Sequence, residues 1–309
     1  MTLVYTTNQI VSVSVSQSTG YAFKVINAGE IENKGVEMSA FGEFDLSADL
    51  KCSVNLNWSK NKNKVVSLVD GLDEVLIGSF GVQVVAKVGA LIETDYVYHS
   101  NGGKIVKSNG RYQSSKADQI IGNGNPDWLG GVRNTLEYKN FAFSFFIDIR
   151  SGGHMYSLDQ RYGQATGVYA MSFYTNDLGN PVRNSLANGG GFIYPGVLAD
   201  GTPNTKRLAA DRFGNTGYRA HPRSAFVYDA SFVKLREVSL RYQLPQSLIS
   251  NTGLSNVSVS LVGTNLWIIS KNSPYADPET GFGSGNIQGI SSGSLPTTRD
   301  LALNVKLQF

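Results

Sequence analysis

The sequence predicts an all-β protein made of antiparallel strands of the kind that form a transmembrane β-barrel. Three observations predict this class. Apolar and polar residues alternate over strand-length segments, the connections between these segments are alternately short and long, and the composition is rich in aromatic residues but poor in charge. The 309 residues include 15 tyrosines, 15 phenylalanines and 34 glycines, and 17% of them are charged, against roughly 25% in soluble domains.

The segment 299–309 carries the most regular alternation. Its apolar positions are Leu301, Leu303, Val305, Leu307 and Phe309. A period of two indicates a β-strand with one apolar and one polar face. Closing strands of bacterial outer-membrane barrels often end on an aromatic residue that the barrel assembly machinery recognises, so we expect these five residues to be an assembly signal. An edge strand of a soluble sheet is the alternative interpretation of this segment.

Ten such segments predict about ten strands, at residues 3–16, 36–44, 50–59, 87–100, 104–112, 128–138, 141–150, 228–242, 257–269 and 299–309. Short connections at 45–47, 101–103, 139–140 and 243–255 separate longer ones. Membrane barrels have short periplasmic turns and longer extracellular loops in this order. We expect segments 3–16 and 299–309 to form the two edges of the sheet.

The alternation also assigns faces to the strands. Phe143, Phe145, Ile147, Leu303 and Val305 are expected to face lipid. Asp148, Asn304 and Lys306 are expected to face the interior of the barrel. The alternation slips near Arg236 and Glu237, which predicts a β-bulge.

Signals for catalysis, metals or cofactors are weak, so we expect a protein that is not an enzyme and has no cofactor. His99, His154 and His221 lack metal-ligand spacing and are expected to be loop or surface residues. Asp277 and Glu279 form a possible carboxylate pair, but a turn held by Asp and Pro side chains is favoured. Cys52 has no partner for a disulfide, and a net charge of +3 gives no indication of nucleic-acid binding.

Aromatic residues in the longest loop are the best candidates for ligand contact. They are Tyr156, Tyr162, Tyr169 and Tyr174, with Arg161 beside them. Sugar rings stack on such side chains while polar groups fix their orientation. Packing of these residues within the loop, or against a partner protein, is the alternative.

Several blocks together resemble the carboxy-terminal part of SusC/RagA-family TonB-dependent outer-membrane receptors of Bacteroidetes. The blocks are GEIENKGVEMSA (29–40), NPDWLGGVRNTLEYKNFAFS (125–144), DASFVKLREVSLRYQLP (229–245), VSLVGTNL (259–266), YADPE (275–279) and PTTRDLALNVKLQF (296–309). Their order and spacing fit along nearly the whole chain, 1–309. The loop 151–204 matches only loosely, so the identity of a ligand does not carry over.

The resemblance implies a larger, 22-stranded barrel with a plug domain inside it. Residues 1–309 would then be a barrel fragment without the plug and without a signal peptide. It also implies location in the outer membrane and import of glycans or peptides with a SusD-like surface lipoprotein. The TonB–ExbB–ExbD complex would act through the plug. The fragment by itself is not expected to transport.

Two other functions are open from the sequence. One is a small passive porin or adhesin of about ten strands, and the other is a secreted all-β glycan-binding or hydrolytic module. A signal peptide directly before residue 1 would favour the first, and solubility without detergent would favour the second. A plug domain encoded upstream would favour the importer.

Overall fold

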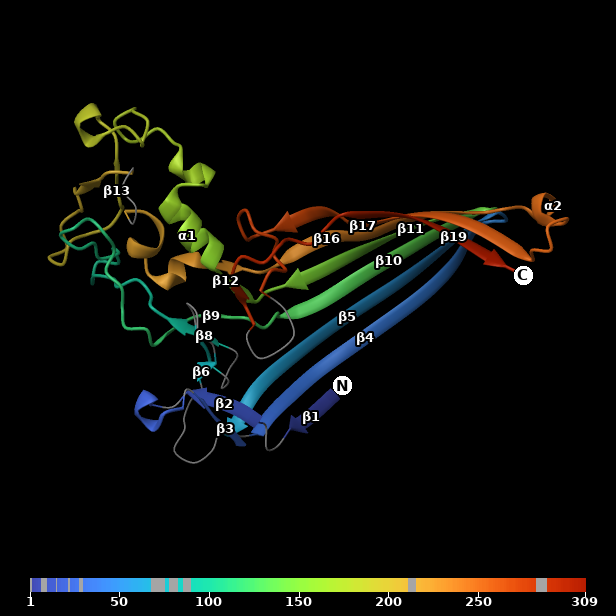
Figure 1. Ribbon diagram of the computed structural model, residues 1–309, viewed down its shortest axis with the longest axis horizontal. Helices are drawn as coiled ribbons and strands as arrows, with labels where there is room; N and C mark the ends of the chain where they lie inside the picture. Colours follow the sequence, from blue (N-terminus) through green and yellow to red (C-terminus); the bar gives the residue numbers. More distant parts are fainter. Residues whose placement is uncertain are drawn as a thin grey trace.

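The computed structural model describes residues 2–6, 10–14, 16–21, 23–27, 30–67, 76–77, 83–85, 90–210, 215–281 and 288–309. Its main feature is an antiparallel sheet of eight strands, shown in Figure 1. In their order across the sheet, the strands are β1 (Thr2–Thr6), β4 (Glu30–Ser47), β5 (Leu50–Ser67), β10 (Trp128–Tyr138), β11 (Phe141–Ser151), β16 (Phe232–Gln243), β17 (Asn256–Lys271) and β19 (Asp300–Gln308).

The connections between these strands confirm the predicted alternation of short and long links. Residues 48–49, 139–140 and 244–255 make the short ones, and the third contains the short helix α2 (Gln246–Ile249). The four other connections are long. Figure 1 shows α2 at one end of the sheet and the loop elements gathered at the other. The loops therefore form a separate layer beyond one end of the strands.

The number of strands in the sheet is a correction to the predicted ten. Residues 87–89 of segment 87–100 lie outside the described residues, and neither residues 90–100 nor segment 104–112 joins the sheet. Residues 90–93 form β8 (Ala90–Glu93), which lies in a small sheet with β6 (Leu76–Ile77), β7 (Gln83–Val85) and β9 (Gln119–Asn123). The turn at 101–103 is real, because His99 N–H donates to the Gly103 carbonyl at 2.8 Å. Only isolated bridges flank it, and Tyr96 and Tyr112 on its two sides pack against each other inside the loop layer.

The first predicted strand is also divided. Residues 2–6 pair with β4 as an edge of the large sheet, whereas β2 (Ile10–Ser14) pairs separately with β3 (Phe23–Asn27). The other edge is β19, which pairs with β17. The expected edge positions are therefore confirmed for residues 2–6 and 300–308. Among the described residues, β1 and β19 do not pair with each other.

The pairing registers confirm which of the predicted residues share a face of the sheet. Phe143 and Phe145 lie on one face of β11, with ring centroids 6.2 Å apart, and Phe145 stands opposite Val238 of β16. Leu303 stands opposite Leu261 on the same apolar face. Asp148 projects to the other face, where it bonds Arg236.

The loop layer has its own small elements and core. The strands are β12 (His154–Ser157), β15 (Val227–Asp229) and β18 (Ile290–Ser291) in one sheet, with β13 (Phe192–Ile193) and β14 (Arg207–Leu208) in another. Helix α1 (Leu158–Thr166) is capped by Ser157, whose side chain accepts from Gln160 N–H, and ends at Gly167 with φ 72°. Short 3₁₀ helices occupy Gln17–Thr19, Ala170–Ser172, Leu186–Asn188, Gly217–Arg219 and Arg223–Phe226.

A hydrophobic core holds this layer together. Leu91, Tyr156 and Phe226 are completely buried and come from three separate long segments of the chain. Such burial requires the loops to fold together as one packed unit. In the part of the chain that the structure describes, no helix has the length and apolar character needed to cross a membrane.

We predict that the two faces of β19 respond differently to charge. Leu303→Lys places an ammonium on the apolar face and should lower the free energy of unfolding in a bilayer by roughly 2–4 kcal/mol. Asn304→Lys, one residue further on the polar face, is the matched control and should have little effect. Urea titration of the protein in lipid vesicles measures both. Equal losses would contradict the assignment of faces.

Candidate functional site

A pocket of about 390 Å³ lies in the loop layer, within the size range of small-molecule sites. Aromatic residues dominate its walls: Tyr96, Tyr174, Phe192, Tyr194, His221 and Tyr228. They come from three distant parts of the chain, and the end of α1 supplies Gln164 and Gly167. The described lining contains no Asp, Glu, Lys or Arg. The pocket therefore offers flat apolar surfaces and uncharged polar groups.

His221 lies at the centre of the aromatic wall. Its Nδ1 is 2.9 Å from the Tyr96 hydroxyl, and its Nε2 is 3.1 Å from the Tyr194 hydroxyl. Tyr194 donates its own proton to the Asn215 carbonyl. It must therefore accept from Nε2–H, which leaves Nδ1 to accept from Tyr96. The neutral ring with its proton on Nε2 satisfies all three groups.

Burial strongly shifts the pKa values of His221 and of the tyrosines around it. It lowers the pKa of His221 to about 4, with Lys104 adding repulsion. Burial raises the pKa of Tyr228 to about 12 and raises the pKa of Tyr96 and Tyr194 further. The pocket wall therefore stays uncharged at neutral pH.

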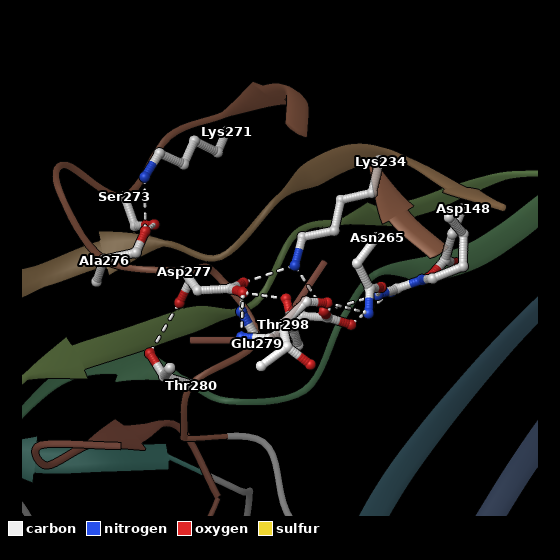
Figure 2. Close-up of polar contacts among 12 residues, drawn as sticks. Asp148, Lys234, Asn265, Lys271, Ser273, Ala276, Asp277, Glu279, Thr280 and Thr298 are labelled. Carbon is white, nitrogen blue, oxygen red and sulfur yellow. Dashed lines mark hydrogen bonds and ion pairs between the residues drawn. The ribbon is translucent and has the colours of Figure 1, made fainter. Parts of the chain in front are cut away.

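A second polar feature is an ion-pair cluster on the polar face of the sheet (Figure 2). Lys234, only 2% exposed, lies 2.6 Å from both Asp277 and Glu279. Arg236 bonds Glu279 through both terminal nitrogens, at 2.9 and 2.5 Å, and also pairs with Asp148. The cluster fixes the segment around Asp277 and Glu279 to β16.

A β-bulge explains why so many charges meet there. Along β11, Phe146 pairs with Glu237 but Ile147 pairs with Leu235, so Arg236 is an extra residue. The register against β17 shifts at the same place. The extra residue allows Arg236 to project to the polar face together with Lys234 and Glu237. The bulge predicted from the sequence is confirmed.

Asp277 is the most fully bonded member of the cluster. Besides Lys234, it accepts from Glu279 N–H at 3.1 Å and from the Thr297 hydroxyl at 2.6 Å and backbone N–H at 3.1 Å. These bonds outweigh burial, which acts in the opposite direction, and hold the pKa of Asp277 at about 2. Asp277 and Glu279 thus lie in a turn, as favoured from the sequence. They also form buried ion pairs, which the sequence did not indicate. Among the described residues, no group of three His, Cys, Asp or Glu side chains could hold a metal ion.

The structure separates the five predicted ligand-contact residues. Tyr174 lines the pocket. Arg161 lies over the rings of Tyr162 and Tyr218 at 5.6 and 5.5 Å, and Tyr169 stacks on Tyr275 at 4.5 Å. Tyr156 is completely buried in the core of the loop layer, so the fold leaves it no surface for a ligand.

Sequence reasoning missed His221 and the tyrosines around it. His221 lies in a loop, as expected, but it is half-buried among aromatic rings rather than at the surface. Its hydroxyl partners Tyr96 and Tyr194 are 125 and 27 residues away in the chain. Local periodicity contains no signal for contacts of that range. The slip near Arg236 was the one local sign of the ion-pair cluster.

No family model matches the chain, but several curated proteins are similar to it in sequence. The chain is 28% identical to TonB-dependent receptor P3 of Formosa agariphila, over 94% of this chain and 30% of that protein. It is 29% identical to TonB-dependent receptor P26 of the same organism, over 98% and 32%. It is 23% identical to TonB-dependent receptor SusC of Bacteroides thetaiotaomicron, over 96% and 28%. The chain thus spans about a third of the length of these relatives.

Solved structures agree on the fold. The RagAB peptide transporter matches 99% of this chain and 32% of its own chain, with a TM-score of 0.66 and 17% identity. The RagAB peptide importer in its closed-closed state gives the same TM-score over 99% and 33%. The resemblance to SusC/RagA-family receptors is confirmed over part of their length, and the eight-stranded sheet matches part of the RagA barrel. The proteins that the chain resembles are receptors and transporters rather than enzymes.

We predict that acid loosens the His221 wall. The pKa of His221 falls from 6.5 in the unfolded chain to about 4, so its contribution to stability is complete above pH 6.5. That contribution is lost as the pH falls towards 4, by roughly 3 kcal/mol. The protection factors of residues 192–194 and 217–226, which are exchange rates corrected for the intrinsic pH dependence of amide exchange, should fall over this range. In His221→Gln, which cannot titrate, these protection factors should stay constant there. An unchanged pH dependence in that variant would assign the effect to another group.

We predict that Asp277→Asn releases the anchored segment. It leaves Lys234 with one carboxylate, and removing one partner of a buried pair costs about 3–5 kcal/mol. Hydrogen exchange and limited proteolysis at residues 272–281 should both increase. Asp45→Asn, at an exposed carboxylate 3.8 Å from Lys51, is the control and should leave this segment protected. Protection of 272–281 in Asp277→Asn would contradict the anchoring role.

Proposed function

We propose that this chain forms part of an outer-membrane TonB-dependent transporter that imports glycans or peptides. The observation that supports the proposal most is the eight-stranded sheet. It has one apolar face, one polar face and a packed loop layer at one end, and it aligns with a RagAB structure over 99% of its length. Its relatives named above are TonB-dependent receptors.

The open edges of the sheet suggest how the chain fits into such a transporter. Unpaired backbone groups are not tolerated in lipid, and β1 and β19 each lack a partner on one side among the described residues. We infer that further strands complete the barrel and that a plug inside it connects to the TonB–ExbB–ExbD complex. On this basis the sheet by itself does not transport.

The loop layer is the proposed ligand-facing part. The ion-pair cluster holds the segment around Glu279 over the polar face, and the uncharged aromatic pocket lies within the layer. Tyr174, Tyr162, Tyr169 and Arg161 remain the proposed ligand contacts. A SusD-like surface lipoprotein is the proposed partner that covers this layer, as suggested by the likeness to a RagAB complex.

The strand β19 is the proposed target of the barrel assembly machinery. Leu301, Leu303, Val305 and Leu307 are all exposed on the apolar face. With Phe309 they form the proposed assembly signal. Its location separates assembly, which depends on β19, from ligand uptake, which depends on the loop layer.

We predict that Tyr174→Ala, made in the receptor that contains this chain, lowers ligand uptake at least about tenfold, because it removes an aromatic wall of the pocket. It should leave the amount of folded receptor in the outer membrane unchanged, measured by heat-modifiable migration. Uptake is measured with labelled oligosaccharide and peptide mixtures.

Tyr98→Ala is the matched control. Tyr98 is a loop tyrosine exposed to a similar degree, 54% against 47% for Tyr174, and it lies outside the pocket. Full uptake by Tyr174→Ala would remove the pocket from the proposed function. Absence of the unmodified receptor from the outer membrane would overturn the function itself.

A further inference from the structure

Strand β5 extends beyond its neighbour β10 and leaves a groove. The pairing between them ends at Ser59 and Leu129, whereas β5 stays paired with β4 as far as Ser67. Residues 123–127, which lead into β10, are not paired with β5. The space between them is a groove of about 530 Å³.

The groove is lined almost entirely by cations and amides. Lys60, Lys62 and Lys64 contribute three ammonium groups, and Asn61, Asn63, Asn123 and Asn125 contribute four amides. Asp127 is the single carboxylate in the described lining. An additional lysine, Lys34, stands opposite Lys62 on β4, where Glu32 pairs with it at 2.8 Å. The groove therefore has a surplus of positive charge.

The groove lies beside the loop end of β5, at the border of the apolar face of the sheet. The three tryptophans of the chain are at the same end of the sheet, near the loop layer: Trp58 in β5, Trp128 in β10 and Trp267 in β17. Trp58 stands opposite Gly130, and the Trp128 ring lies so close to Gly130 that an added Cβ would be 3.0 Å from it. Tryptophans of membrane proteins concentrate at the level of the lipid headgroups.

The lysines of β5 begin directly beyond the level of these three tryptophans. In β5 the apolar positions Val54, Leu56 and Trp58 are followed, on the same face, by Lys60, Lys62 and Lys64. A lipid whose acyl chains lie along the apolar face would therefore bring its headgroup to the groove. Lysines at this depth extend their ammonium groups towards the headgroups.

We propose that this groove binds the phosphate-bearing headgroup of a lipid in the leaflet next to the loop layer. Clustered lysines attract anionic lipid through their combined charge, and Asn123 and Asn125, on the segment across the groove from β5, add amide donors for phosphate oxygens. A lipid is favoured over free phosphate because the groove is continuous with the apolar face. The inference rests on the proposed outer-membrane location.

The test uses the receptor that contains this chain, purified in neutral detergent. The probe is lipid A, a glycolipid with two phosphates, and binding is measured by microscale thermophoresis at two salt concentrations. Lys60→Gln combined with Lys62→Gln and Lys64→Gln should weaken binding roughly tenfold or more and reduce its dependence on salt. Lys51→Gln combined with Lys139→Gln and Lys306→Gln is the control, with the same change in charge elsewhere on the sheet, and should change the affinity less than about twofold.

Three results would overturn the inference. They are equal affinity of the two triple variants, binding of inorganic phosphate as tight as that of lipid A, and tighter binding of an acidic peptide. The unmodified receptor gives a further test that holds even if the Lys60, Lys62 and Lys64 triple variant fails to fold. If its affinity for lipid A does not fall as salt is raised, the inference is also contradicted. Heat-modifiable migration, measured in parallel, reports on barrel formation. Loss of the barrel in the unmodified receptor would contradict the proposed function instead.

Discussion

The pairing of each strand with its neighbours in one continuous sheet is the constraint on which this structure depends. Backbone N–H and C=O groups need partners wherever water is absent. The eight strands supply them to one another in order from β1 to β19, except along the end of β5 beyond Ser59, where β10 does not reach. Because side chains alternate along each paired strand, the register that satisfies the backbone also separates the two faces. Leu261 meets Leu303 on one face, and Ser260 meets Asn304 on the other.

The bulge at Arg236 interrupts this alternation and changes which charged side chains share a face. Regular pairing would direct Lys234 and Arg236 to one face and Glu237 to the other. The extra residue brings all three towards the polar face, where Arg133 pairs with Glu237 at 2.6 Å and Lys234 holds Asp277. Buried ion pairs contribute little net stability compared with apolar packing. Their consequence here is positional, since the segment around Glu279 has a single location on the sheet wall.

The sequence predicted those parts of the fold that depend on local pattern. Segment 299–309 alternates without error and forms β19 (Asp300–Gln308). The two expected hairpins are present, one with its turn at 139–140 and the other with its turn at 48–49, just beyond the expected 45–47. Segment 87–112 has similar alternation and a real turn at 101–103, but its described residues, 90–112, lie in the loop layer. Alternation shows that a segment is extended and has two faces, and it does not show which sheet or core the apolar face meets.

The candidate site was less predictable for the same reason. Tyr174 reaches the pocket, while Tyr156, eighteen positions earlier, fills a core with Leu91 and Phe226. Both are loop tyrosines with similar neighbours in sequence, so only long-range packing distinguishes them. His221 gains its role from hydroxyl groups that the fold brings from Tyr96 and Tyr194.

The same register gives the chain three polar environments with different charge. The groove beside β5 has excess lysines, the wall around Arg236 has balanced ion pairs, and the pocket around His221 has no charged lining among its described residues. These differences follow from the face of the sheet and from the distance beyond the ends of the strands. Just beyond the tryptophans, cations are complementary to anionic headgroups. On the polar face, charges neutralise one another because they are partly removed from water. Inside the loop layer, burial disfavours charge altogether, and the pocket presents ring faces and hydroxyl groups instead.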